Sequence, residues 1–226
     1  MSPLWCAAMA VRNGRVDGLE LAKLLIGRGA NVNVVGYDKA LIESSPLWCT
    51  ARAVKANVVG GLEFARLIVE SGVDVDVNIG SHDEEGNESS PLWWAARAVR
   101  DGGAGGLELS MLLIEKGANV NAVGKNEEGD ESSPLWWAAW AVRDGKSDGL
   151  VLAKLLVERG ADVNAVGKHY LNKGTPLLWA ARAARDRREH GATLVRLLVL
   201  ADGDLMAENE TELYGTIDDA MGNLES

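Results

Sequence analysis

The chain has 226 residues, of which 47% are hydrophobic, and it carries a formal net charge of −10. This share of apolar side chains excludes a disordered chain and is enough to bury a substantial core. The acidic balance disfavours nucleic acid and membrane surfaces as partners, because their phosphates would be repelled. No apolar run is long enough to cross a membrane.

The first predicted element begins with Ser-Pro-Leu-Trp at Ser2. The same opening recurs at Ser45, Ser90 and Ser133, and a variant, Thr-Pro-Leu-Leu, begins at Thr175. The steps between these openings are 43, 45, 43 and 42 residues. A period in this range predicts stacked supersecondary units, each of which cannot bury its apolar face alone.

Each unit is predicted to contain two helices, as the third unit illustrates. Ser90 is a favourable N-cap, and Pro91 fits the first helical position. Apolar side chains at helical spacing follow at Leu92, Ala95, Ala96 and Val99. Glycines between residues 102 and 106 end this helix, and Gly117 ends the next one. The apolar side of the second helix holds Leu107, Leu109, Leu112, Leu113 and Ile114.

Two distances in the sequence favour a solenoid over unrelated domains. From the opening serine to the glycine that ends the second helix there are 27 steps in each of the first four units. From that glycine to the next opening there are 16, 18, 16 and 15 steps. The helical part is constant because it must stack, whereas an exposed loop can vary in length.

We therefore expect five repeats, at about 2–44, 45–89, 90–132, 133–174 and 175–204, followed by an acidic, degenerate cap at 205–226. No cap precedes the first repeat, so apolar surface around Leu4, Leu21 and Leu25 is expected to be uncovered. Two explanations stay open. Either the chain is cut from a longer one, or another molecule covers this end.

The openings Ser/Thr-Pro-Leu-x-x-Ala-Ala, with the closing segments Gly-Ala-Asn-Val-Asn at 29–33 and 117–121, resemble the ankyrin repeat family. The resemblance covers residues 2 to about 202 and implies an all-α, ankyrin-like solenoid with extended finger loops.

These repeats differ from the family's pattern, and they are about ten residues longer. The family's signature histidine is replaced by Leu178 in the fifth repeat and by tryptophan in the others, namely Trp5, Trp48, Trp93 and Trp136. In the family this histidine ties its helix to a neighbouring loop. Since an indole has one donor, we expect packing to replace part of that tie.

Cys6 and Cys49 hold the same place in the first two repeats. Packed helices lie roughly 8–10 Å apart, which is too far for a disulfide between equivalent positions. Both are therefore expected to be buried, reduced thiols. This favours an intracellular protein, most simply a cytoplasmic one, with the nucleus left open.

The best candidate site is a stripe along the first helix of each repeat. Starting at the tryptophan position, residues i, i+4 and i+7 share a helix face and would form a ladder with an aromatic base and a cationic edge. In ankyrin-like proteins these helices line the concave face, which with the fingers is the usual binding surface. The stripe is predicted to bind an acidic or mixed-charge protein segment through Arg52, Lys55, Trp93, Arg97, Arg100, Trp136, Trp140, Arg143, Arg182 and Arg185.

Other interpretations of the same residues stay open. Cations near a helix C-terminus are stabilised by the helix dipole, and the tryptophans can belong to the core between repeats. Single-stranded nucleic acid also binds aromatic and basic grooves. Acidic fingers, however, would repel it at Asp83, Glu84, Glu85, Glu88, Glu127, Glu128, Asp130 and Glu131. These fingers lack the spacing of an EF-hand calcium loop.

No enzyme motif is found. His82, His169 and His190 are isolated in the sequence, without partners at metal-ligand spacing. We expect no catalytic residue, no metal and no cofactor. The predicted function is a non-catalytic protein-interaction module that exists as a monomer or as part of a longer array. The alternative is a structural role through end-to-end contact at the uncapped first repeat.

Overall fold

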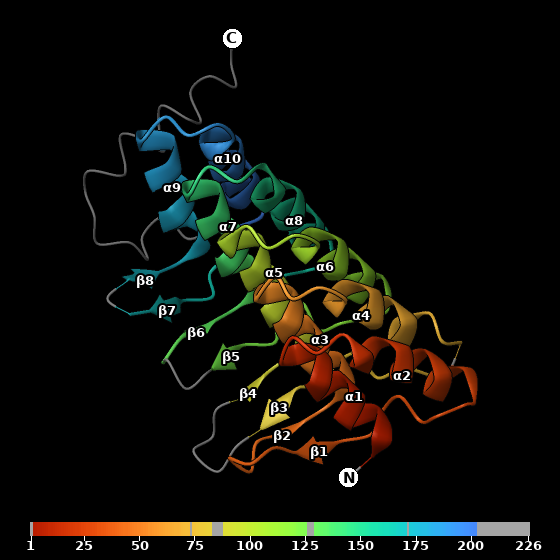
Figure 1. Ribbon diagram of the computed structural model, residues 1–226. Helices are drawn as coiled ribbons and strands as arrows, with labels where there is room; N and C mark the ends of the chain where they lie inside the picture. Colours follow the sequence, from red (N-terminus) through yellow and green to blue (C-terminus); the bar gives the residue numbers. More distant parts are fainter. Residues whose placement is uncertain (1, 73, 83–87, 126–128, 171, 203–226) are drawn as a thin grey trace.

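The computed structural model describes residues 2–72, 74–82, 88–125, 129–170 and 172–202. Within these ranges the chain forms five pairs of helices and eight short strands (Figure 1). The first helix of each pair, called the inner helix, is α1 (Pro3–Arg12), α3 (Pro46–Lys55), α5 (Pro91–Asp101), α7 (Pro134–Arg143) or α9 (Pro176–Arg185). The second, called the outer helix, is α2 (Asp17–Gly27), α4 (Gly61–Val69), α6 (Gly106–Glu115), α8 (Ser147–Glu158) or α10 (Gly191–Leu200).

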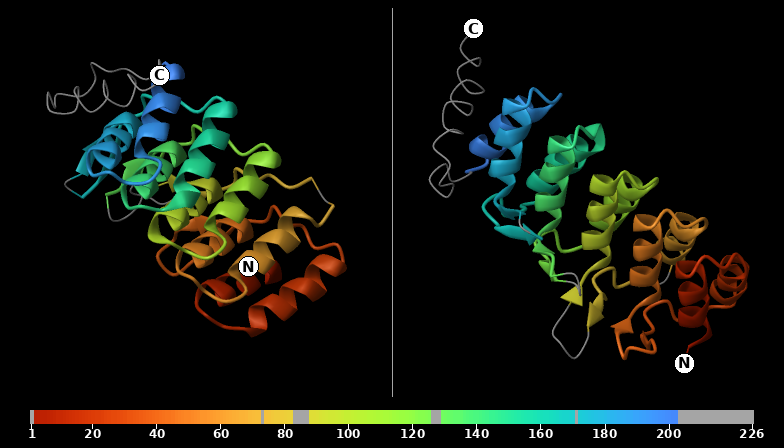
Figure 2. Two further views of the ribbon diagram at one scale, coloured as in Figure 1. Left: turned by 90° about the horizontal axis from the view of Figure 1, so that it is seen from above. Right: turned by 60° about the vertical axis from the view of Figure 1, so that its left-hand side comes forward.

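The helix pairs stack in chain order along a curved array, as Figure 2 shows. Each inner helix packs against its own outer helix and against the inner helices before and after it. This arrangement confirms the repeat solenoid. The bounds of the five repeats remain a prediction, and the expected cap at 205–226 lies outside the described residues. None of the described helices has the length and apolar character that a bilayer crossing requires.

The inner helices begin where the sequence predicts. Four opening hydroxyls accept a hydrogen bond from the backbone N–H three residues later, and proline occupies the first helical position. These caps are Ser45, Ser90, Ser133 and Thr175. Ser2 opens α1 without such a bond.

The fingers contain strands that the sequence did not predict. The strands are β1 (Gly36–Tyr37), β2 (Glu43–Ser44), β3 (Ser81–His82), β4 (Glu88–Ser89), β5 (Gly124–Lys125), β6 (Glu131–Ser132), β7 (Gly167–His169) and β8 (Asn172–Gly174). They form two antiparallel sheets in the orders β1-β2-β3-β4 and β5-β6-β7-β8. Each sheet therefore joins the hairpin of one finger to the hairpin of the next, so the fingers are fixed to each other as well as to the helices.

Asparagines at the base of the fingers also link successive repeats. Asn33 donates from Nδ2 to the Asp74 carbonyl at 2.7 Å and accepts at Oδ1 from the Asp76 N–H at 2.9 Å. Asn121 makes the equivalent pair of bonds two repeats further on, with the Gly160 carbonyl at 3.0 Å and the Asp162 N–H at 2.7 Å. Each amide thus satisfies one donor and one acceptor of the following turn.

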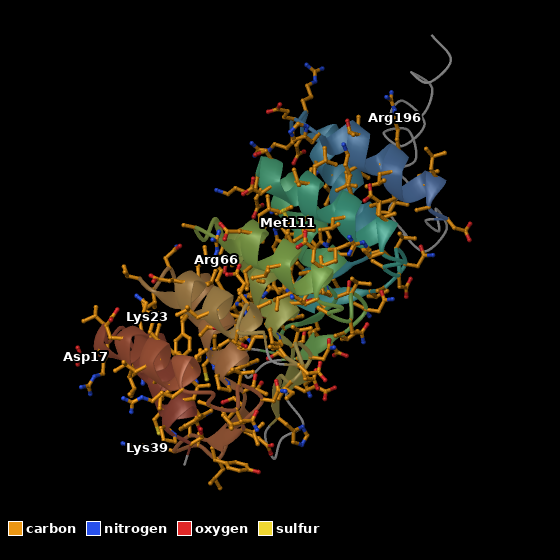
Figure 3. The ribbon with its side chains drawn as sticks, turned by 90° about the vertical axis from the view of Figure 1, so that its right-hand side faces the viewer. Asp17, Lys23, Lys39, Arg66, Met111 and Arg196 are labelled. Atoms are coloured by element: carbon orange, nitrogen blue, oxygen red, sulfur yellow. The ribbon has the colours of Figure 1, made fainter. Side chains whose placement is uncertain are left out.

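Exposed ion pairs join neighbouring outer helices. Lys23 Nζ lies 3.0 Å from Glu63 Oε1, and Arg66 forms an ion pair with Glu108. Figure 3 shows Lys23, Arg66 and Met111 in succession along this side. Pairs exposed to this degree contribute little to stability.

The core runs through all five helix pairs, and its first layer is open. Leu21 is 42% exposed, whereas Phe64 and Leu109, at the same position of the next two outer helices, are 0% exposed. The expectation of uncovered apolar surface is therefore right for Leu21. It is wrong for Leu4, which is 1% exposed because it belongs to the buried core cluster.

Candidate functional site

The structure divides the predicted stripe into a buried floor and an accessible edge. Trp93 and Trp136 are 0% exposed, Trp140 is 2% exposed and Arg97 is 4% exposed. These four residues cannot touch a partner, which corrects the prediction for them. The reason is that an inner helix has neighbours on two sides, so only a narrow part of its surface is open. The accessible members are Arg52, Lys55, Arg100, Arg143, Arg182 and Arg185.

The tryptophans at the signature position connect each repeat to the next. Each indole N–H donates to an oxygen that precedes the following inner helix. The bonds run from Trp5 to Ser44 Oγ (3.2 Å), from Trp48 to Ser89 Oγ (3.0 Å), from Trp93 to the Ser132 carbonyl (3.0 Å) and from Trp136 to the Gly174 carbonyl (2.8 Å). Each of these indoles thus keeps a hydrogen-bonded tie to the next repeat, and two oxygens of Ser132 accept from Trp93. That packing replaces part of the family's tie stays a prediction.

A second aromatic layer was not predicted, although its members directly follow the signature position in three repeats, after Trp93, Trp136 and Leu178. Trp94, Trp137 and Trp179 are all buried. Trp93 and Trp94 meet edge to face, with centroids 4.8 Å apart. Trp140 stacks on Trp179, with centroids 4.7 Å apart and an interplanar angle of 10°. Pairs of this kind stabilise a core beyond the area that they bury.

Guanidinium groups lie over these rings from the accessible side. Arg52 is 5.2 Å from the centroid of Trp48 and 5.0 Å from that of Trp94. Arg100 lies 4.6 Å from the Trp140 ring. The Trp179 ring has Arg182 at 4.9 Å and Arg143 at 5.9 Å. These distances are within the range of cation–π attraction, so the rings hold the arginines in place.

The accessible edge is not purely cationic, contrary to the prediction. Asp101 and Asp144, at the ends of α5 and α7, are interleaved with the basic side chains. Arg100 contacts Asp101 at 2.8 Å and Asp144 at 3.3 Å. Further pairs join Lys55 to Asp101 at 3.6 Å and Arg143 to Asp144 at 3.1 Å. The charges of the second, third and fourth repeats therefore alternate in sign.

A buried ionic cluster fixes the third and fourth fingers to the inner helices. Asp130 is 0% exposed, and its Oδ2 lies 2.8 Å from Arg97 Nη1. Its other oxygen is hydrogen-bonded to Nδ1 of His169, whose ring packs edge-on against Trp137 and Trp140. Two expectations are corrected here. His169 is not isolated, and Asp130 does not belong to an exposed acidic finger. Residues 83–87 and 126–128 of those fingers lie outside the described residues.

The described residues offer no group of three histidine, cysteine or acidic side chains that could hold a metal. The two cysteines are unpaired, as expected, but Cys6 is exposed while Cys49 is buried. The prediction of burial was wrong for Cys6, because nothing in the described chain covers that side of α1. Burial raises the pKa of the Cys49 thiol from 9.0 to about 11, although a hydrogen bond with Ser44 acts against this. A thiol with this pKa is a poor nucleophile at neutral pH.

Stacked helix pairs with hairpin fingers define the class of helical repeat solenoids. Residues 1–37, 87–125 and 130–168 match the family model of the ankyrin repeat. These stretches make up just over half of the chain, which therefore belongs to the ankyrin repeat family. Members of this family are generally protein-interaction modules without catalytic activity.

No curated protein matches the sequence. Among solved structures, one similar chain comes from a structure described as the Bd0816 predatory endopeptidase from Bdellovibrio bacteriovorus in complex with immunity protein Bd3460. The identity is 18% and the TM-score 0.49, over 99% of this chain and 94% of that chain.

Proposed function

We propose that this chain is a non-catalytic module that binds a protein or peptide segment along the accessible edge of its inner helices. The observation that carries the proposal is the row of guanidinium groups held over buried tryptophan rings. Arg52, Arg100, Arg143 and Arg182 each lie within 6 Å of a ring centroid. Arginines that are positioned before binding lose less conformational entropy when they bind.

The charges of this edge favour a partner with acidic and basic side chains in alternation. A carboxylate can accept two parallel hydrogen bonds from one guanidinium. Asp101 lies between Lys55 and Arg100, and Asp144 lies between Arg100 and Arg143. A partner must therefore place cations or neutral donors opposite these two aspartates. The same two aspartates would repel consecutive phosphates, which supports a protein over a nucleic acid or a membrane.

A peptide library displayed on phage tests this proposal. Binders are selected on the wild-type chain and compared on the triple variant Lys55→Gln, Arg100→Gln, Arg143→Gln. The matched control removes three exposed charges from the outer side, through Arg28→Gln, Lys116→Gln and Lys154→Gln. We expect the first triple variant alone to lose affinity, by about threefold to about 150-fold, since three exposed pairs contribute about 0.2–1 kcal/mol each. Equal binding by both triple variants, with unchanged melting, would reject the inner edge.

Assembly through the first repeat is the second candidate. It is favoured by the open core positions Leu21 and Leu24, which are 42% and 63% exposed. A helix pair of another copy would cover them in the way that each repeat covers the next. Light scattering over a concentration series tests this, with Leu21→Lys as the disrupting variant. A mass that stays at one chain at every concentration argues against assembly. The unpaired cysteines support an intracellular location for either function.

A further inference from the structure

The turn that follows α9 differs from its counterparts in the other repeats. After each inner helix one residue adopts left-handed backbone geometry. This residue is glycine or asparagine in four repeats, namely Gly14 (φ 79°), Asn57 (φ 54°), Gly102 (φ 75°) and Gly145 (φ 78°). In the fifth repeat it is Arg187, with φ 52°. Left-handed geometry is unfavourable for an arginine, because its Cβ crowds the backbone, and it is favourable for glycine.

The fold does not need this arginine side chain. The turn is held by backbone bonds from the N–H of Arg187 to the Ala184 carbonyl (3.0 Å) and from the N–H of Arg188 to the Ala183 carbonyl (2.8 Å). The equivalent bonds form in the fourth repeat, where Gly145 has no side chain. A residue that adopts unfavourable backbone geometry without a structural reason is a candidate for a function.

The charged side chains around the turn also indicate a function for it. Arg187 and Arg188 are exposed and form no ion pair within the described part of the chain. They also precede the N-terminus of α10, where the helix dipole disfavours cations. Arg185, the last residue of α9, contacts Asp186 at 3.2 Å, but both side chains are more than 40% exposed. Residues 185–188 of this turn hold three guanidinium groups and one aspartate, whereas residues 143–146 of the fourth repeat hold one arginine, one lysine and one aspartate. Glu189 follows directly, so what sets this turn apart is its three guanidiniums and not its net charge.

This turn is continuous with the accessible edge of the inner helices. A Cβ atom placed on Gly145 would lie 3.9 Å from Nη1 of Arg188. The guanidinium of Arg188 therefore reaches back over the turn that follows Arg143 and Asp144. A bound segment that leaves Arg143 would meet Arg188 next.

We infer that Arg185, Arg187 and Arg188 form the carboxylate-binding end of the protein-binding surface, and that the part of the partner bound there is an acidic peptide segment. The inference rests on the proposed function. It adds to that function the kind of side chain, a carboxylate, that binds at one end of the protein-binding surface. Three guanidiniums next to each other match clustered aspartate or glutamate side chains, because each can bind a carboxylate with two hydrogen bonds.

Arg187→Gly separates binding from stability and provides the test. The probe is a fluorescent peptide of alternating glutamate and alanine, titrated at low and at physiological salt into the full chain. The variant with Arg187→Gly and Arg188→Gln is expected to bind several-fold to about tenfold more weakly, because two exposed pairs are lost. Its melting temperature should be equal to or above that of the wild type, since glycine suits the left-handed position. The matched control is Arg28→Gln with Lys116→Gln, which should bind as the wild type does.

Three outcomes of the titration with the glutamate peptide would overturn the inference. They are no binding of the glutamate peptide by the wild type, equal binding by the wild type and the turn variant, and equal binding of a peptide in which glutamine replaces glutamate. If a thymidine oligonucleotide of the same charge binds more tightly than the glutamate peptide, the partner of this turn is a nucleic acid and not an acidic peptide. The library-selected peptides separate this inference from the proposed function. Suppose that the variant at Lys55, Arg100 and Arg143 no longer binds them, whereas the turn variant still does. The inference then fails, and the proposed function stands.

Discussion

Trp48 and Ser89 are joined by a hydrogen bond of 3.0 Å from the indole N–H to Oγ, across an interval of 41 residues. Trp94 donates to the same oxygen at 2.9 Å. The hydroxyl thus uses both of its acceptor sites, and Ser81 Oγ lies 3.1 Å away to receive its proton. One buried serine therefore satisfies an indole from each of two successive repeats and connects both to a finger.

Ser89→Ala is expected to lower the free energy of unfolding by about 2–4 kcal/mol, because it leaves two buried indole donors without an acceptor. Ser44→Ala is the matched control, since Ser44 accepts from one indole only, that of Trp5. Its expected cost is about 1–2 kcal/mol. Urea unfolding followed by tryptophan fluorescence measures both. Equal costs would show that the bond from Trp94 contributes nothing.

Gly124→Ala is expected to destabilise the protein through its contact with Trp93. A Cβ atom on Gly124 would lie 2.6 Å from the Trp93 ring, so the indole would have to move away from its acceptor at Ser132. Forcing an extra carbon into a packed core costs about 1–3 kcal/mol. Gly27→Ala is the control, because that helical glycine has open space around it. It should stabilise the chain by about 0.5–1 kcal/mol. The melting temperature is therefore expected to fall below that of the wild type in Gly124→Ala and to rise above it in Gly27→Ala.

The repeat, its helix starts and its helix ends could be predicted because their causes are local. A serine followed by proline begins a helix wherever it stands, and a glycine with left-handed geometry ends one. The strands of the fingers could not be predicted. Each is only two or three residues long, and its pairing is with another finger or across a hairpin, so no alternation of polar and apolar residues is visible.

The sequence predicted which helix face holds the residues of the candidate site, but it did not predict which of their side chains are exposed to solvent. Helical spacing shows that Trp136, Trp140 and Arg143 share a face, but it does not show how much of that face the neighbouring helices cover. Here α5, α8 and α9 pack against α7, and Arg143 is the one residue of this helix that is not buried. The pairing of Asp130 with His169 joins residues 39 apart. No local pattern indicates such a contact.

Asp130→Asn is expected to be among the most damaging polar substitutions in this chain. It would remove the buried carboxylate 2.8 Å from the Arg97 guanidinium and leave Asp101, at 3.9 Å and partly exposed, as a weaker counter-charge. Breaking a buried ion pair costs about 3–5 kcal/mol. Asp144→Asn removes an aspartate whose side chain is 28% exposed and should cost at most about 1 kcal/mol. Chemical denaturation of both variants at one pH provides the comparison. A similar cost for the two would mean that water reaches the Arg97 cluster in solution.

The two thiols are expected to differ in reactivity with a disulfide reagent at pH 8. Cys6 is exposed and should react within the mixing time, whereas Cys49 is buried and should react only when the protein opens. One thiol should therefore titrate in the native protein and two in denaturant. Rapid reaction of both thiols in the native protein would contradict the burial of Cys49.

The Cys49 thiol also makes stability depend on pH in the alkaline range. Its pKa is raised from 9.0 to about 11 in the folded protein, so between these values the unfolded chain loses this proton more readily. The contribution of the thiol is therefore complete below pH 9 and is lost as the pH rises towards 11. Unfolding measured from pH 8 upwards should show a fall that is smaller in Cys49→Ala than in Cys6→Ser. If the two variants lose stability in parallel, this proton is not the cause, because only the first variant removes the group that titrates in the interior.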